Sequence, residues 1–186
     1  MTADRMPEGE VALLLAEYLL AHPRSGPRVD VAIDGASVLA HGSVVFDIMA
    51  FLNSRDWVQV SPDKGKNDWT GVYSRSDKAL CVHSRSGVGD VVCAFGERRV
   101  IAECKKGPLT RKPGSPERPL LANALGQALT TKCSPHDIVV AAVPHSEAFA
   151  KIAMEWRTRP LLVRSSIQIA LVEQNGQVHG LDLGAL

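Results

Sequence analysis

The sequence predicts an α/β fold in which helices pack around a single β-sheet. Three observations predict it. Segments with helical periodicity alternate with segments of strand periodicity, no repeat or break in composition divides the chain, and 186 residues suit one domain. We therefore treat residues 1–186 as a single domain.

Composition limits the function mainly by exclusion. The hydrophobic fraction is 45%, the charged fraction is 22% and the net charge is +1, so no global charge points to a polyanionic partner. No apolar run is long enough to span a membrane, and the N-terminus does not resemble a signal peptide. The chain also lacks a P-loop and a nucleophile elbow, which argues against motor and serine-hydrolase chemistry. These features favour a cytoplasmic protein with no membrane partner.

The cysteines agree with that location. They show no CxxC spacing and stand in apolar surroundings, so we expect buried free thiols rather than disulfides or zinc ligands. The four cysteines are Cys81, Cys93, Cys104 and Cys133.

In the first half of the chain, a helix is predicted over residues 8–21. Its inward face would hold Val11, Leu14, Leu15, Tyr18 and Leu19, and Pro23 would end it. The remaining predicted elements of this half are a short strand at 28–33, a helix at 44–54, a strand at 57–60, a loop at 61–67 and a hairpin at 69–84 that turns at Ser76-Asp77.

The second half continues with a hairpin at 90–105. Residues 107–119 contain four prolines, so we expect no regular element there. The elements predicted after it are a helix at 120–131, a buried strand at 137–143, a helix capped by Ser146 and a final hairpin with a type I′ turn at Asn175-Gly176.

The hairpin at 90–105 brings acids together. Gly96-Glu97 suits a two-residue type II′ turn, and counting outward from it places Asp90 opposite Glu103. Directly opposed side chains have Cβ atoms about 5 Å apart, so two carboxylates there repel unless a cation lies between them. The two-residue period then predicts Lys105 on the face of Glu103.

That arrangement has a clear chemical use. Two carboxylates with a backbone carbonyl, for which Cys104 is placed, form an all-oxygen site that favours Mg²⁺, with Mn²⁺ as a substitute. Such a cation activates water and stabilises charge at a phosphate, and a neighbouring lysine assists. Glu-x-Lys alone is a common surface ion pair, so the opposed Asp90 carries the prediction.

Asp90, a spacer of 12 residues and then Glu103-Cys104-Lys105, followed by a helix, resembles the PD-(D/E)xK, or restriction-endonuclease-like, nucleases. The resemblance implies a central mixed β-sheet flanked by helices on both sides. It implies that Asp90 and Glu103 bind the metal and that Lys105 serves the attacking water. Gly89 stands where many members have proline.

The resemblance also implies further site residues and a division of the chain. Many members carry an acid on the first core helix, which Asp47 matches, and a polar residue on the helix after the motif, which Gln127 matches. The catalytic core would span 42–143, with 1–40 as an N-terminal helical extension and 144–186 as a C-terminal helix and hairpin. We weigh Asp47 as a ligand against a solvated helix residue, and Gln127 as a site residue against a surface one.

Other polar residues are secondary candidates. Basic residues around the motif, namely Arg85, Lys106, Arg111 and Lys112, could contact a phosphate backbone or simply keep the loops soluble. We expect Glu17 on the first helix to be solvated. His136 and His145 have no obvious metal partners at ligand spacing.

The predicted function is a metal-dependent nuclease acting on DNA. Two alternatives stay open: a catalytically silent nucleic-acid-binding or assembly subunit of a larger complex on the same fold, and a ribonuclease. Cutting both strands of a duplex takes two sites, so a homodimer or partner subunits would suit the first hypothesis.

Overall fold

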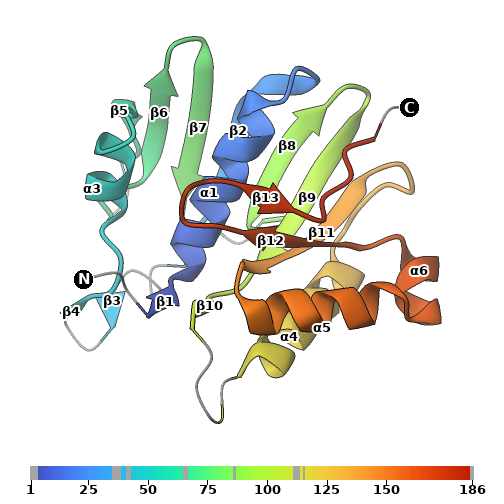
Figure 1. Ribbon diagram of the computed structural model, residues 1–186. Coiled ribbons are helices and arrows are strands. Elements are labelled where there is room, and N and C mark those ends of the chain that lie inside the picture. The colour runs from blue at the N-terminus through green and yellow to red at the C-terminus, as the bar shows by residue number, and fades with distance from the viewer. Residues whose placement is uncertain are drawn as a thin grey trace.

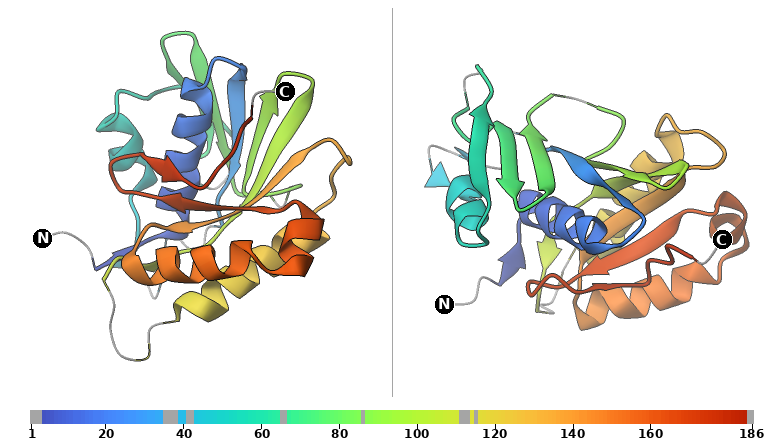
Figure 2. Two further views of the ribbon diagram at one scale, coloured as in Figure 1. Left: turned by 45° about the vertical axis from the view of Figure 1, so that its right-hand side comes forward. Right: turned by 90° about the horizontal axis from the view of Figure 1, so that it is seen from above.

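The computed structural model describes residues 4–34, 39–40, 43–64, 67–85, 87–110, 114 and 116–184. A large mixed β-sheet curves around one long helix, and further helices lie on its outer side (Figures 1 and 2). The α/β class and the flanked sheet are thus as predicted. Among the described helices, none has the length and apolar character that crossing a bilayer requires.

The helices are α1 (Glu8–Ala21), α3 (Ile48–Asn53), α4 (Glu117–Thr130), α5 (Glu147–Arg157) and α6 (Pro160–Ser165). The strands are β1 (Arg5–Met6), β2 (Ser25–Ala32), β3 (Leu39–Ala40), β4 (Ser43–Val44), β5 (Val58–Pro62), β6 (Gly71–Arg75), β7 (Lys78–His83), β8 (Val91–Phe95), β9 (Arg98–Cys104), β10 (Gly107–Pro108), β11 (Ile138–Pro144), β12 (Gln168–Val172) and β13 (Val178–His179).

Within the described residues the main sheet has nine strands in the order β13-β12-β11-β9-β8-β2-β7-β6-β5. Strand β11 runs parallel to both of its neighbours, and β2 runs parallel to β7. The other neighbouring pairs are antiparallel. Every residue of β11 except Val139 is buried, as expected for a strand with parallel neighbours on both sides.

Helix α1 lies in the hollow of the curved sheet. We predicted one inward face, but Ala12, Leu13 and Ala16 on its other sides are buried as well. The cause is the hairpin of β12 and β13, which crosses over α1 (Figure 1), together with Leu183 of the segment that follows. A helix that is apolar all round is a buried helix.

A second, smaller core fills the outer side of the sheet. Leu121 and Ala124 of α4 and Phe149 of α5 pack there against the alternate residues of β11, Ala141 and Val143. Ser146 caps α5 as predicted, accepting from the Phe149 amide at 3.3 Å. Helices therefore cover both faces, and the sheet lies between two apolar layers.

Several predicted elements need correction. The helix expected at 44–54 is shorter, because Ser43–Val44 forms β4 and Asp47 is the N-cap of α3. In the proline-rich stretch, β10 pairs with β1, and α4 begins at Glu117 with Pro119 in its first turn, where a missing N–H costs nothing. Helix α6 was not anticipated.

The N-terminal segment is also placed differently from our prediction. We expected residues 1–40 to be an extension outside the catalytic core. Instead β2 is a central strand between β8 and β7, and α1 covers it. Helix α1 and strand β2 therefore belong to the centre of the fold.

Candidate functional site

The hairpin of β8 and β9 has the predicted register. Val91 pairs with Ala102 and Phe95 with Arg98, and the Asp90 amide donates to the Ala102 carbonyl at 2.9 Å. Gly96 has φ of +60°, and Glu97 is not among the non-glycine residues with positive φ, as a type II′ turn requires. Asp90 and Glu103 therefore stand at the open end of the hairpin.

Asp90 is held against the strand that carries Glu103. Its Oδ2 accepts from the Cys104 amide at 2.7 Å. Burial raises the pKa of Asp90 to about 6, and the nearby carboxylates of Glu103 and Glu8 push it in the same direction. The Cys104 amide and the Lys105 ammonium oppose this rise without cancelling it. The environment therefore disfavours the ionised form of Asp90.

Glu103 lies beside the end of α4. The hydroxyl of Thr131, the C-cap of that helix, donates to Glu103 Oε1 at 2.9 Å. Burial raises the pKa of the Glu103 carboxyl, while this hydrogen bond lowers it. Two half-buried acids with raised pKa values thus occupy one end of the hairpin, which is typical of sites that bind cations or transfer protons.

Lys105 directly follows β9, and its amide still donates to the Ala142 carbonyl of β11 at 2.9 Å. Its Nζ lies 3.2 Å from Glu8 Oε1, on α1 and therefore on the other side of the sheet from Thr131. The lysine still acts electrostatically on both Asp90 and Glu103. The group comprises four ionisable side chains: Glu8, Asp90, Glu103 and Lys105.

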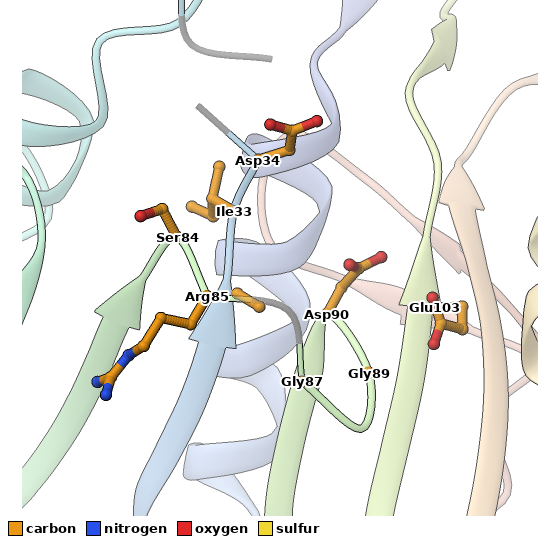
Figure 3. Close-up of a pocket in the computed structure, with 9 residues that line it drawn as sticks. Ile33, Asp34, Ser84, Arg85, Gly87, Gly89, Asp90 and Glu103 are labelled. Carbon is orange, nitrogen blue, oxygen red and sulfur yellow. The ribbon is translucent and has the colours of Figure 1, made fainter. Parts of the chain in front are cut away.

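A pocket of about 380 Å³ opens beside the acids, which we name the Asp90 pocket. It lies where β2 and β7 end and β8 begins, and Asp90 and Glu103 line one side of it (Figure 3). Asp34 and Ser84 line the other strand ends. Its lining is polar, as a phosphate or hydrated cation would need.

The residue before Asp90 is Gly89, and the structure leaves no room there for a side chain. A Cβ placed on it would lie 2.8 Å from Ile101 Cγ2 and 3.1 Å from the Ala102 carbonyl oxygen. The backbone at Gly89 therefore approaches β9 too closely for a larger residue. This departure from the proline of the PD-(D/E)xK pattern has a local steric cause.

The other predicted site residues are not drawn to the acids. Asp47 is exposed and caps α3, accepting from the Ala50 amide at 2.9 Å. The side chain of Gln127 is exposed on α4, and neither residue lines the Asp90 pocket. The residue one turn after Gln127 is Thr131, which contacts Glu103, and its hydroxyl also donates to the Gln127 carbonyl at 3.1 Å.

The predicted basic contacts are equally scattered. Arg85 lines the pocket, but its guanidinium extends away from Asp90 (Figure 3) and lies 3.9 Å from Asp63. Lys106 is exposed, and Arg111 and Lys112 lie outside the described residues. The Cys104 side chain is fully buried, so only its backbone adjoins the acids.

Glu17 also corrects a prediction. We expected it to be solvated, but it is only 7% exposed and accepts from Arg55 Nε at 2.5 Å, Trp57 Nε1 at 2.6 Å and Arg75 Nη1 at 2.9 Å. Glu17 therefore has a structural role, as the shared anion of two ion pairs. Cys133 is likewise exposed rather than buried.

Two residues of the site were missed from the sequence. Glu8 begins α1 directly after Pro7, where an acid is commonly explained by the helix dipole. Thr131 ends α4, where threonine is unremarkable. A pairing of acids with Lys105 could have suggested an acid at the start of α1, but no local spacing links them.

No protein-family model matches the sequence, and no curated protein or solved structure shows significant similarity to it.

Proposed function

We propose that the protein is a metal-dependent nuclease that hydrolyses phosphodiester bonds, with DNA as its first substrate class. The observation that carries the proposal is the pair of half-buried acids, Asp90 and Glu103, that the β8–β9 hairpin sets at the Asp90 pocket. Lys105 and Glu8 adjoin them. Acids that lack enough hydrogen-bond donors are stabilised by a cation, and oxygen donors suit Mg²⁺ or Mn²⁺.

The chemistry of the donors fits such a cation. Asp90 and Glu103 supply carboxylate oxygens, Asp90 has its pKa raised to about 6, and the Cys104 backbone is adjacent. The side chains would need to rotate to bind one cation. In the described structure, no choice of one oxygen each from Glu8, Asp90 and Glu103 brings all three within 4.8 Å of one another. When bound, a divalent cation would polarise the phosphate and lower the pKa of a water.

The chain's own residues would do the rest. Asp90 and Glu103 would hold the cation at the mouth of the pocket, and Thr131 would keep Glu103 oriented through its hydroxyl. Lys105 would have to exchange its Glu8 partner for the phosphate or the attacking water, and Glu8 could then receive a proton. Only the Lys105 ammonium is a cation in this group, so its loss would be severe.

The proposed fold type is restriction-endonuclease-like. In support, α1 precedes β2, the strands β2, β8 and β9 are successive antiparallel neighbours, and α4 leads to β11 beside β9. This arrangement takes the first core helix to be α1 rather than the helix at 44–54. The helix acid would accordingly be Glu8 and not Asp47.

A nuclease assay on duplex, single-stranded and branched DNA and on RNA, with Mg²⁺ or Mn²⁺, tests the proposal. Wild type should cleave at least one substrate, and Asp90→Asn or Lys105→Ala should reduce the rate by about 10²- to 10⁴-fold. Lys151→Ala, an exposed lysine on the outer helix α5, is the matched control and should leave the rate unchanged.

Cleavage that survives both substitutions would exclude this mechanism. Cleavage of RNA alone would make the protein a ribonuclease with the same site. Metal-independent binding of nucleic acid without cleavage of any substrate would favour the silent-subunit alternative.

A further inference from the structure

We propose that His145, Glu173 and His179 form a binding site for a late first-row transition-metal dication, of which Zn²⁺ is the physiological candidate. This cluster lies apart from the Asp90 pocket and does not rest on the proposed nuclease function. We predicted no metal partner for His145, because its partners are far away in sequence. The fold brings all three together.

The ligand atoms converge. One ligand atom from each residue lies within 4.8 Å of the other two. Glu173 Oε1 is shared, lying 2.5 Å from His179 Nε2 and 3.6 Å from His145 Nδ1. The two imidazole rings are 4.9 Å apart between centroids. Two ring nitrogens therefore face one carboxylate oxygen, which an isolated ion pair does not require.

The backbone holds the three residues in place. His145 directly follows β11, and its amide donates to the Val172 carbonyl at 2.7 Å, next to Glu173. His179 is on β13, paired with Leu171 of β12. The cluster is thus fixed by three neighbouring strands, β11, β12 and β13.

The turn of the β12–β13 hairpin orients the carboxylate. Its three-residue loop is closed by the Glu173 amide, which donates to the Gln177 carbonyl at 2.8 Å. Gly176 takes the positive φ, +90°, while Asn175 does not, so the predicted type I′ turn at Asn175-Gly176 is wrong. Asn175 instead uses its Nδ2 to donate to Glu173 Oε2 at 3.0 Å, an outer contact of the kind that aligns metal ligands.

The donor set selects the metal. Imidazole nitrogens favour zinc and its neighbours over Mg²⁺, and two histidines with one glutamate leave a coordination position for water. Bonds of about 2.1 Å in a tetrahedron place ligands roughly 3.4 Å apart. Side-chain movements of about 1 Å from the observed separations would reach this spacing, and side-chain exposures of 26–47% leave access for the ion.

The alternative is a surface Glu–His ion pair. A metal site would bind Zn²⁺ through these three side chains, whereas a surface ion pair would have no measurable affinity for it.

Titration of chelator-stripped protein with Zn²⁺ by calorimetry tests the site. Wild type should bind one Zn²⁺ per chain in this cluster, and Co²⁺ should give the visible absorption of a four-coordinate site. His179→Ala and Glu173→Gln should each weaken this binding by about 100-fold or more. Zn²⁺ should also raise the melting temperature of wild type but not of these variants.

Three controls isolate the cluster. His136→Ala removes an exposed histidine outside it, Cys133→Ser removes an exposed thiol, and Asp90→Asn alters the proposed nuclease site, so all three should keep the Zn²⁺ affinity of wild type. A wild type that binds no Zn²⁺ would overturn the proposal. So would Zn²⁺ binding that is unchanged in both His179→Ala and Glu173→Gln.

Discussion

Glu17 and Asp90 are both acids largely withdrawn from water, yet their surroundings differ in kind. Glu17 accepts from three side-chain donors, two of them the guanidinium groups of Arg55 and Arg75. Among the described residues, Asp90 accepts from one backbone amide, and it has two other carboxylates as neighbours. The first acid is compensated by the fold itself, and the second is left short of positive charge.

The difference separates structural from functional burial. A buried acid with enough donors contributes to stability, and Arg75 adds to this by lying 4.4 Å over the Trp57 ring. A buried acid without them is a cost that a ligand can offset. Three substitutions can break or sharpen this comparison.

The largest effect is expected at the compensated acid. Glu17→Gln should lower the free energy of unfolding by about 3 kcal/mol, because it leaves the guanidinium groups of Arg55 and Arg75 without their anion and offers one acceptor oxygen in place of two. Urea denaturation measures the change. Glu97→Gln in the exposed hairpin turn is the control, with an expected change below about 0.5 kcal/mol. Equal stability of the two variants would contradict a structural role for Glu17.

At Asp90 the expected effect is opposite in sign and depends on pH. Its pKa of about 6 in the folded state exceeds its ordinary value of 3.8, so the folded state binds the proton more tightly. The resulting stability is complete below pH 3.8 and is lost as the pH rises through about 6, a loss of at most about 3 kcal/mol.

Asp90→Asn removes that titration. In EDTA, the variant should gain stability relative to wild type between pH 4 and pH 7, as measured by thermal unfolding across this range. Saturating Mg²⁺ should raise the stability of wild type and leave that of Asp90→Asn unchanged. A difference in stability between Asp90→Asn and wild type that does not change with pH would show that burial does not disfavour the ionised form of Asp90.

The smallest effect concerns Asp47, which the PD-(D/E)xK resemblance made a metal ligand. Asp47→Ala should cost about 1 kcal/mol by removing the cap of α3, and should leave any nuclease rate within about twofold of wild type. Stability and rate are measured on the same preparation. A rate loss comparable to that of Asp90→Asn would restore Asp47 to the site.

Local features of the fold were predictable from the sequence. The bounds of α1 follow from its apolar residues and the proline after it, the Gly96 turn sets the β8–β9 register, and Ser146 caps α5. Each depends on residues only a few positions apart, so propensity, periodicity and turn chemistry are sufficient. The opposed Asp90 and Glu103 follow from the same counting.

The partners of those residues were not predictable. Glu8 and Lys105 are 97 residues apart, and Glu17 and Arg75 are 58 apart. No periodicity links positions that meet only when α1 is enclosed between the sheet and the β12–β13 hairpin. The same holds for His145 and Glu173, which sit at the ends of neighbouring parallel strands.

The sequence by itself therefore determined the bounds of α1, the register of the β8–β9 hairpin and the acids at its open end. Tertiary structure alone decided that Glu17 has arginine partners, that Asp90 has too few hydrogen-bond donors, and that Lys105 pairs with Glu8. The physical reason is that the pKa and the role of an acid depend on the solvent and charges within a few ångströms, and packing between distant segments sets those. Asp90 and Glu17 are both acidic in the sequence, and only the fold separates their roles.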